Sequence, residues 1–367
     1  MNFFQHQAQA ERKTVRLVIL FVITVAAIIV ACYLVVLLAY YWFEKKNGVS
    51  LLFDARPIPW WNRDIFYSTA AAVLSIVVVG SLWKIRSLAG GGAVVASQLG
   101  GKYVPPDTRD PDERKLRNVV EEIAIASGTA VPEVFVLDQE EGINAFAAGY
   151  SPDDAAVAVT RGCVKHLSRD ELQGVIAHEF SHICNGDMRL NIRLIGLIHG
   201  ILVIGLIGQA ILRSISDGSR VRTNRKSGGG VLAIALLGAL IMVIGYIGVF
   251  FGRVIKAAVS RQREFLADAT AVAFTRNPDG LAGALKKIGG HSLRSAVRAP
   301  AAEQASHMFF ASGFDASVLF ESLLATHPPL VERIRRIDPS FDGNFPKLAA
   351  SRPARHPSTA RPVKPEE

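Results

Sequence analysis

Two histidines and a glutamate near the middle of the chain have the spacing of a metal-dependent hydrolytic site. His178, Glu179 and His182 form the pattern H-E-x-x-H. On a helix, residues four apart lie about one turn apart on the same side, so both imidazoles can reach a single ion. Glu179 is then placed to accept a proton from the water that attacks a substrate. The motif predicts that His178 and His182 bind zinc and that Glu179 is a general base.

The residues around this motif predict the helix that it needs. Ser168 and Glu171 form a capping box. Apolar residues then recur at helical spacing, namely Leu172, Val175, Ile176, Phe180 and Ile183. The helix is expected to end near Asn185 and Gly186. A chance match of three fixed letters is the alternative, and the capped helix argues against it.

A catalytic zinc site needs a third protein ligand and leaves a fourth position open for water. A third histidine shortly downstream is absent, because Asn and Met occupy positions 185 and 188. Glu264 and Asp268 follow the last hydrophobic block, and their spacing of four puts both on one side of a helix. One carboxylate can bind the metal while the other accepts the N–H of a ligand imidazole. An exposed acidic pair balancing neighbouring arginines is the alternative.

These residues belong to a chain whose apolar residues are segregated into blocks. Half of its 367 residues are hydrophobic and 20% are charged, yet the mean hydropathy is +0.27. Four blocks without Asp, Glu, Lys or Arg are long enough to cross a membrane, at about 17–43, 65–83, 194–212 and 231–252. The first is too long for the apolar core of a cleaved signal peptide. For the last two, a buried hairpin in a soluble core is the alternative.

The blocks predict a mainly α membrane protein that also carries a small α+β catalytic domain. A helix is expected over Pro111–Ser127, followed by strands at Glu133–Leu137, Ile143–Ala148 and Ala155–Thr160. We expect five regions: a membrane region (1–86), the first part of the catalytic domain (87–193), a membrane hairpin (194–252), the second part of the catalytic domain (253–340) and a disordered tail (341–367).

The net charge of +9 is explained by membrane orientation, and no nucleic-acid partner is expected. Lysines and arginines cluster after the second block, before the third and after the fourth. The positive-inside rule then places both hydrophilic segments in the cytoplasm. The basic loop at 213–230 opposes this rule if both hairpin helices cross fully, so the topology of the hairpin stays open.

The chain resembles the HtpX-type integral-membrane zinc metalloproteases, bacterial relatives of the Ste24 and Oma1 peptidases. The resemblance rests on HEFSHICNGD, a two-span hairpin, REFLADA and THPPLVERI in this order, preceded by Asn-Ala-Phe-Ala at 144–147. It extends from the first span to about Ile337. It implies a gluzincin-type metallopeptidase domain with one Zn²⁺ per chain. In that arrangement His178, His182 and Glu264 are the metal ligands, Glu179 is the general base and Asp268 orients a ligand histidine.

The resemblance also suggests a donor to the oxyanion of the reaction. His327 lies in the segment Thr-His-Pro-Pro, where the two prolines fix the backbone and similar peptidases have a histidine. A helix-entry role before a proline is the alternative for His327. Arg333 could assist His327, but we assign it to the basic face of the following helix, together with Arg335 and Arg336.

The strand Ile143–Ala148 resembles the edge strand that pairs with extended substrate in these peptidases. Asn144, Ala145 and Phe146 are therefore expected to bind substrate. A turn-forming role for Asn144 is an equal alternative.

The resemblance implies a multi-pass protein of the bacterial inner membrane with its catalytic domain facing the cytoplasm. Its partners are then the lipid bilayer and misfolded or damaged membrane proteins, which it cleaves in quality control. A Ste24-like processing peptidase for prenylated proteins is one alternative, although four spans are few for it. A non-catalytic membrane scaffold with a structural metal is another, and it has no need of Glu179.

Overall fold

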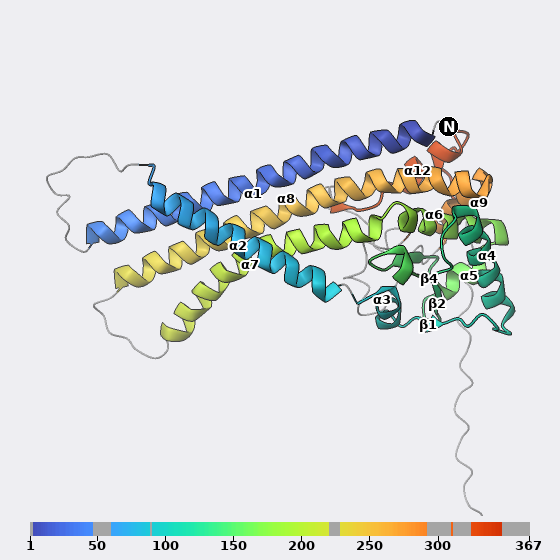
Figure 1. Ribbon diagram of the computed structural model, residues 1–367, viewed down its shortest axis with the longest axis horizontal. Helices are drawn as coiled ribbons and strands as arrows, with labels where there is room; N and C mark the ends of the chain where they lie inside the picture. The colour runs from blue at the N-terminus through green and yellow to red at the C-terminus, as the bar shows by residue number, and fades with distance from the viewer. Residues whose placement is uncertain are drawn as a thin grey trace, which may run out of the picture.

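The computed structural model describes residues 3–46, 60–88, 90–219, 228–291, 310 and 324–346. A bundle of four long helices runs into a smaller mixed domain at one end (Figure 1). In chain order the elements are α1 (Phe3–Lys46), α2 (Arg63–Leu88), α3 (Gly92–Gln98), β1 (Lys102–Tyr103), α4 (Pro111–Ser127), β2 (Glu133–Leu137), β3 (Ala145–Ala148), the short 3-10 helix η1 (Pro152–Asp154), β4 (Ala156–Thr160), α5 (Arg161–His166), α6 (Arg169–Cys184), α7 (Asp187–Ser219), α8 (Gly228–Thr275), α9 (Pro278–Gly290) and α12 (Leu330–Ile337).

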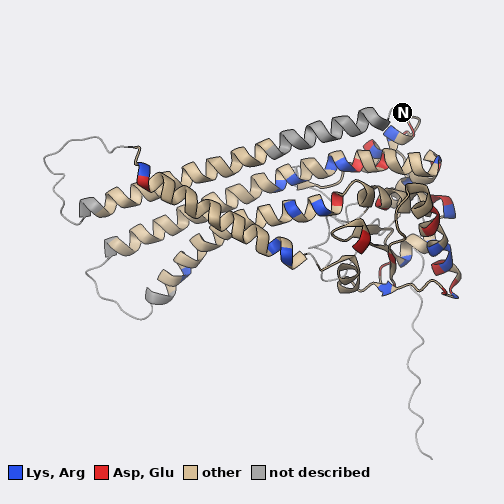
Figure 2. Cartoon of the chain, in the orientation of Figure 1, with Lys and Arg blue, Asp and Glu red and all other residues tan. Residues whose placement is uncertain are grey.

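The four long helices, α1, α2, α7 and α8, are apolar and long enough to cross a membrane. Each exposes large apolar side chains, for example Val22, Val79, Ile207 and Leu232. Figure 2 shows few charged residues along most of the bundle, whereas the mixed domain carries both signs of charge. An apolar surface of this extent is stable in lipid and unfavourable in water. The predicted mainly α membrane fold is confirmed, and the soluble-core hairpin is excluded.

Three of these helices extend well beyond the hydrophobic blocks that predicted them, and the first, α1, begins at Phe3 and not near residue 17. α7 begins at Asp187 and not near residue 194, and α8 continues past residue 252 to Thr275. The catalytic domain and the hairpin therefore share continuous helices. Of the basic loop at 213–230, residues 220–227 lie outside the described residues.

A four-stranded sheet with the order β1-β2-β4-β3 forms one layer of the mixed domain. β2 and β4 are parallel, while β1 and β3 pair antiparallel with their neighbours, so β3 is an edge strand. The three strands expected from the sequence are present, with β3 and β4 slightly shorter than expected. The two-residue strand β1 was not expected, because its exposed residues give no apolar alternation.

The helix that carries the histidine motif begins where the sequence predicts. The Ser168 hydroxyl accepts the Glu171 N–H, and the Glu171 carboxylate accepts the Ser168 N–H. α6 is packed between the sheet and α9, with Leu172, Ile176 and Phe180 fully buried. This packing fixes the position and the rotation of α6, and therefore of its two histidines, relative to β3.

The chain beyond α12 is not uniformly outside the core. Phe341 is buried, and Phe345 packs on the core beside it with ring centroids 5.5 Å apart. The tail expected from residue 341 onward thus starts with packed residues. Residues 347–367 lie outside the described residues.

The crossing of α6 and α9 leaves no room for a side chain at Gly174. A Cβ there would lie 2.7 Å from the backbone nitrogen of Leu281. We expect Gly174→Ala to lower the free energy of unfolding in detergent by about 1–3 kcal/mol, although alanine is the better helix former. Gly90→Ala is the control, because its Cβ would meet only Val94 atoms at 3.8 Å or more. Equal stability of the two variants would contradict this packing.

Candidate metal centre

Three side chains from two helices converge on one point inside the catalytic domain. The Nε2 atoms of His178 and His182, on α6, are 3.2 Å apart. The Glu264 carboxylate, on α8, lies 3.6 Å from the first and 3.5 Å from the second. Within the described part of the chain, this is the one group of three such side chains whose ligand atoms lie within 4.8 Å of one another.

Each of the two imidazoles is oriented by a buried aspartate on its other nitrogen. His178 Nδ1 is 2.9 Å from the Asp268 carboxylate, and His182 Nδ1 is 2.8 Å from that of Asp187. Because a carboxylate accepts the proton, each Nδ1 is the donor in the neutral ring. Both Nε2 atoms then present lone pairs toward Glu264.

Each aspartate is in turn paired with an arginine. Arg333, on α12, donates to Asp268 through two nitrogens, at 2.9 and 2.7 Å. Arg263 Nε lies 3.2 Å from Asp187. Two arginine–aspartate–histidine arrangements therefore approach the same point, one from α8 and α12 and the other from α7 and α8.

The donor set fits a divalent cation. Two lone pairs and a carboxylate that face each other at these distances repel one another unless a cation lies between them. Burial disfavours protonation of His182, yet the hydrogen bond to Asp187 and the charges of Asp187 and Glu264 raise its pKa to about 9. With both imidazoles neutral, as metal ligands must be, and all four carboxylates ionised, including Glu179, two arginines leave two negative charges for a divalent cation to balance. Two imidazoles and one carboxylate are a donor set typical of zinc.

Glu179 is buried beside this cluster. Its side chain is 1% exposed, and no side chain among the described residues hydrogen-bonds its carboxylate, whereas the Ala147 backbone interacts with it. Burial penalises the charged form and raises the pKa of Glu179, while the neighbouring histidines oppose this shift. A buried carboxylate without an ion-pair partner is suited to exchanging protons.

His327 also lies at the cluster. Its Nδ1 is 3.0 Å from a Glu264 oxygen, and its side chain is buried. The backbone that carries it is held by Arg261, which donates to the Ala325 carbonyl at 2.7 Å. The structure thus brings His327 together with the residues of the histidine motif.

Two residues of the site, Asp187 and Arg333, have positions that the sequence does not predict. Asp187 follows His182 by five residues and belongs to no recognisable spacing. Gly186, with a φ of 67°, turns the chain so that Asp187 faces back toward that histidine. The assignment of Arg333 to an exposed basic face is wrong, because its side chain is fully buried. The partner of the buried Arg333 is Asp268, which lies on α8. The charge pattern of α12 alone therefore does not predict this ion pair.

The segment expected to bind substrate is at the edge of the sheet, as β3, but its side chains differ in position. Phe146 packs against α3 on the face of the sheet away from α6. Asn144 is buried, and its side chain accepts the Ala145 N–H at 3.0 Å. The Ala145 carbonyl accepts the N–H of Phe310, whose ring packs edge-on against His178.

The sequence matches a model of peptidase family M48 over residues 110–340. That range contains the histidine motif, Glu264, Asp268 and His327. It also includes the two helices of the hairpin.

Curated relatives are named as HtpX proteases. A protease HtpX homolog of Listeria monocytogenes is 36% identical, covering 76% of this chain and 88% of the relative. One from Thermoanaerobacter pseudethanolicus is 39% identical over 60% of this chain and 70% of the relative. A crystal structure of S. mikatae Ste24p aligns with a TM-score of 0.46 and 18% identity, covering 72% of this chain and 58% of that one.

The two aspartates predict how metal affinity responds to substitution. We expect Asp187→Asn and Asp268→Asn each to weaken metal binding by about 10- to 100-fold, because a neutral amide holds the imidazole less firmly and makes it a poorer donor. Affinity is measured by competition with a chelating dye. Asp153→Asn, at an exposed carboxylate on η1, is the matched control. Normal affinity in Asp187→Asn would show that His182 binds without this support.

Proposed function

The chain belongs to peptidase family M48 and is a membrane-bound metalloprotease, and we propose that it is an endopeptidase that uses one zinc ion. His178, His182 and Glu264 are the proposed ligands. The observation that supports this most directly is the convergence of their donor atoms within 4.8 Å beside the buried Glu179.

Each residue of the site has a separate role in the proposed reaction. When bound, zinc lowers the pKa of water and polarises the substrate carbonyl. Glu179 accepts the proton of the attacking water and delivers it to the leaving amine. His327 donates to the oxyanion of the tetrahedral intermediate. Asp268 and Asp187 keep the two imidazoles in the tautomer that exposes Nε2.

The edge strand β3 is the proposed binding site for an extended substrate segment. Residues 144–146 contribute mainly through the backbone, since Phe146 packs its ring against α3. The hydrogen bond from the Phe310 N–H to the Ala145 carbonyl, at 2.8 Å, supports the proposal, because this segment from outside the sheet pairs with β3 through its main chain. Main-chain pairing selects unfolded segments with little regard for their sequence.

The proposed location is the bacterial inner membrane, with the catalytic domain in the cytoplasm and misfolded or damaged membrane proteins as substrates. The lysines and arginines where the bundle meets the catalytic domain support this orientation (Figure 2). The HtpX names of the relatives support the bacterial setting.

The continuity of α8 indicates where such substrates are cut. Its apolar part ends at Phe251, and Arg253 begins its charged part. Glu264 follows eleven residues later on the same helix, which corresponds to about 17 Å along the axis. The proposed zinc site therefore lies above the lipid headgroups, so the scissile bonds are in juxtamembrane segments and not within the bilayer.

Replacement of Glu179 tests its role in catalysis separately from metal binding. We expect Glu179→Gln to bind zinc normally but to cleave an unfolded protein at least about 100-fold more slowly, because the amide cannot accept a proton. Zinc content and initial rates are measured in purified, detergent-solubilised protein. Glu133→Gln, at an exposed glutamate of β2, is the control.

The other outcomes are equally informative. Wild-type cleavage by Glu179→Gln would refute the role of this residue. Glu264→Gln should lower zinc occupancy, and full occupancy would place the third ligand elsewhere. A wild-type protein that holds zinc but cleaves no unfolded protein would favour the scaffold alternative.

The distance of the proposed zinc site from the membrane predicts how far from a transmembrane segment a substrate is cut. An extended chain advances about 3.3 Å per residue, so about five residues must separate a transmembrane segment from the bond that is cut. We expect single-span substrates with one cleavable segment to be cut slowly when the linker is shorter than this and rapidly when it is longer. Cleavage is followed by gel in reconstituted vesicles. The same segment without a span controls for its intrinsic reactivity, and equal rates at all linker lengths would contradict the rule.

A further inference from the structure

Five cations gather where the bundle meets the catalytic domain. They lie at the end of α2, near the start of α7 and in the middle of α8, and we refer to them as the interfacial cation cluster: Lys84, Arg86, Arg193, Arg253 and Lys256. Helix contacts show that the three segments are at one level. A Cβ on Gly196 of α7 would touch Ile85 of α2, and one on Gly252 of α8 would touch Ile198 of α7.

No carboxylate among the described residues pairs with these cations. In the described part of the chain none of the five has a carboxylate within 4.0 Å. Arg86, Arg193 and Arg253 are exposed. Arg189, one turn before Arg193 on α7, is different, because it donates to the Tyr150 carbonyl and lies over the Tyr150 ring.

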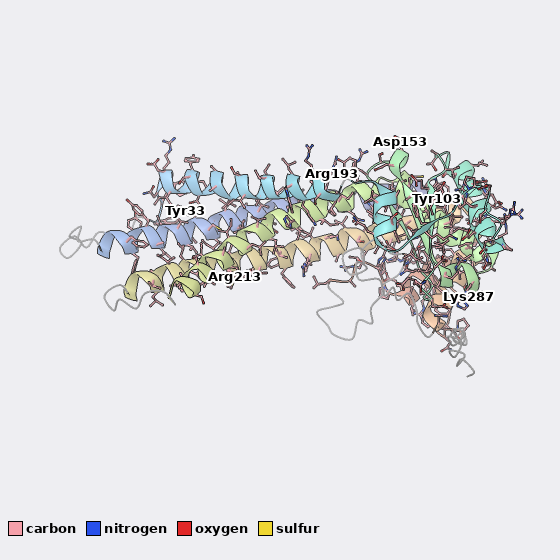
Figure 3. The ribbon with its side chains drawn as sticks, turned by 90° about the horizontal axis from the view of Figure 1, so that it is seen from below. Tyr33, Tyr103, Asp153, Arg193, Arg213 and Lys287 are labelled. Carbon is pink, nitrogen blue, oxygen red and sulfur yellow. The ribbon has the colours of Figure 1, made fainter. Side chains whose placement is uncertain are left out.

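The surroundings of the cluster have the character of a membrane surface. Trp83, 63% exposed, precedes Lys84 and stacks on His199 with ring centroids 5.5 Å apart. Phe250 and Phe251 are exposed just before Arg253. Exposed aromatic rings next to cations are typical of the depth at which lipid headgroups lie. In Figure 3, Arg193 lies near the catalytic end of the bundle, far from Arg213 on the same helix.

We propose that the interfacial cation cluster binds the headgroups of anionic phospholipids. Phosphates at the level of Trp83 lie at the depth of the cations on all three helices, and α7 packs against both α2 and α8. Arginine binds phosphate oxygens in pairs, and each cation near an anionic surface adds about 1 kcal/mol, which corresponds to about fivefold in affinity. An acidic protein would have to approach a belt of exposed apolar side chains that the bilayer covers, which favours the lipid as the partner. This surface is independent of the proposed reaction.

The test uses Trp83 as a local reporter in the full-length protein. Trp42, Trp60 and Trp61 are replaced by Phe, and the protein is reconstituted in phosphatidylcholine vesicles. An equal fraction of either phosphatidylglycerol or phosphatidylcholine, brominated close to the headgroup, is then included as a quencher. We expect phosphatidylglycerol to quench Trp83 more strongly. Arg193→Gln and Arg253→Gln should each reduce this preference by up to about fivefold.

Arg213→Gln is the matched control, since it removes one exposed arginine of α7 at the other end of the bundle. Its lipid preference at Trp83 should equal that of the parent. Unchanged zinc content in each variant shows that the fold is intact. The reporter protein without an arginine substitution gives a second measurement. Added salt should weaken its preference for phosphatidylglycerol, because salt screens the charges. Equal quenching by the two lipids, or a preference that survives both substitutions and high salt, would overturn the proposal.

Discussion

The arrangement of the site depends on two hydrogen bonds between buried aspartates and imidazole Nδ1 atoms. Asp268 and Asp187 accept from His178 and His182, so both Nε2 lone pairs are turned toward Glu264. Each aspartate is a buried charge and would be costly without a cation. Arg333 and Arg263 supply these cations, and the remaining excess of negative charge at the centre is what a divalent metal neutralises. Metal binding and the packing of the surrounding helices are therefore coupled.

This constraint explains why the membrane hairpin lies inside the catalytic domain. The hairpin helices contribute directly to the site, since Asp187 is the first residue of α7 and Arg263, Glu264 and Asp268 are on α8. α6 and α7 are separated only by Asn185 and Gly186. The two helices that lead into the membrane thus hold opposite sides of the proposed zinc site. A change in how α7 and α8 pack would move Asp187 relative to Glu264.

The features that the sequence predicts well are those whose signals are local. The ends of α4 and α6 are marked by Asp110, Gly128 and a capping box, and β2 is an apolar run between turn residues. The spacing of His178 and His182 is likewise local. The roles of Arg333 and Asp187 are not predicted, because their partners come from other helices. Burial by a partner that is distant in sequence does not change the pattern of the neighbouring residues. The lengths of α7 and α8 are not predicted for a related reason. A helix continues past its apolar block where its polar residues have partners, and these partners come from elsewhere in the fold.

Arg333 shows what a guanidinium contributes that another cation does not. It donates to both oxygens of Asp268 and to the Phe310 carbonyl, and its Cζ lies 4.7 Å from the Phe310 ring centroid. A lysine ammonium lacks the planar fork that makes these contacts simultaneously. Phe310 in turn donates to the Ala145 carbonyl of β3. The edge strand is thereby connected through Phe310, Arg333 and Asp268 to His178, so a displacement of Phe310 from Ala145 would be transmitted to the support of a proposed metal ligand.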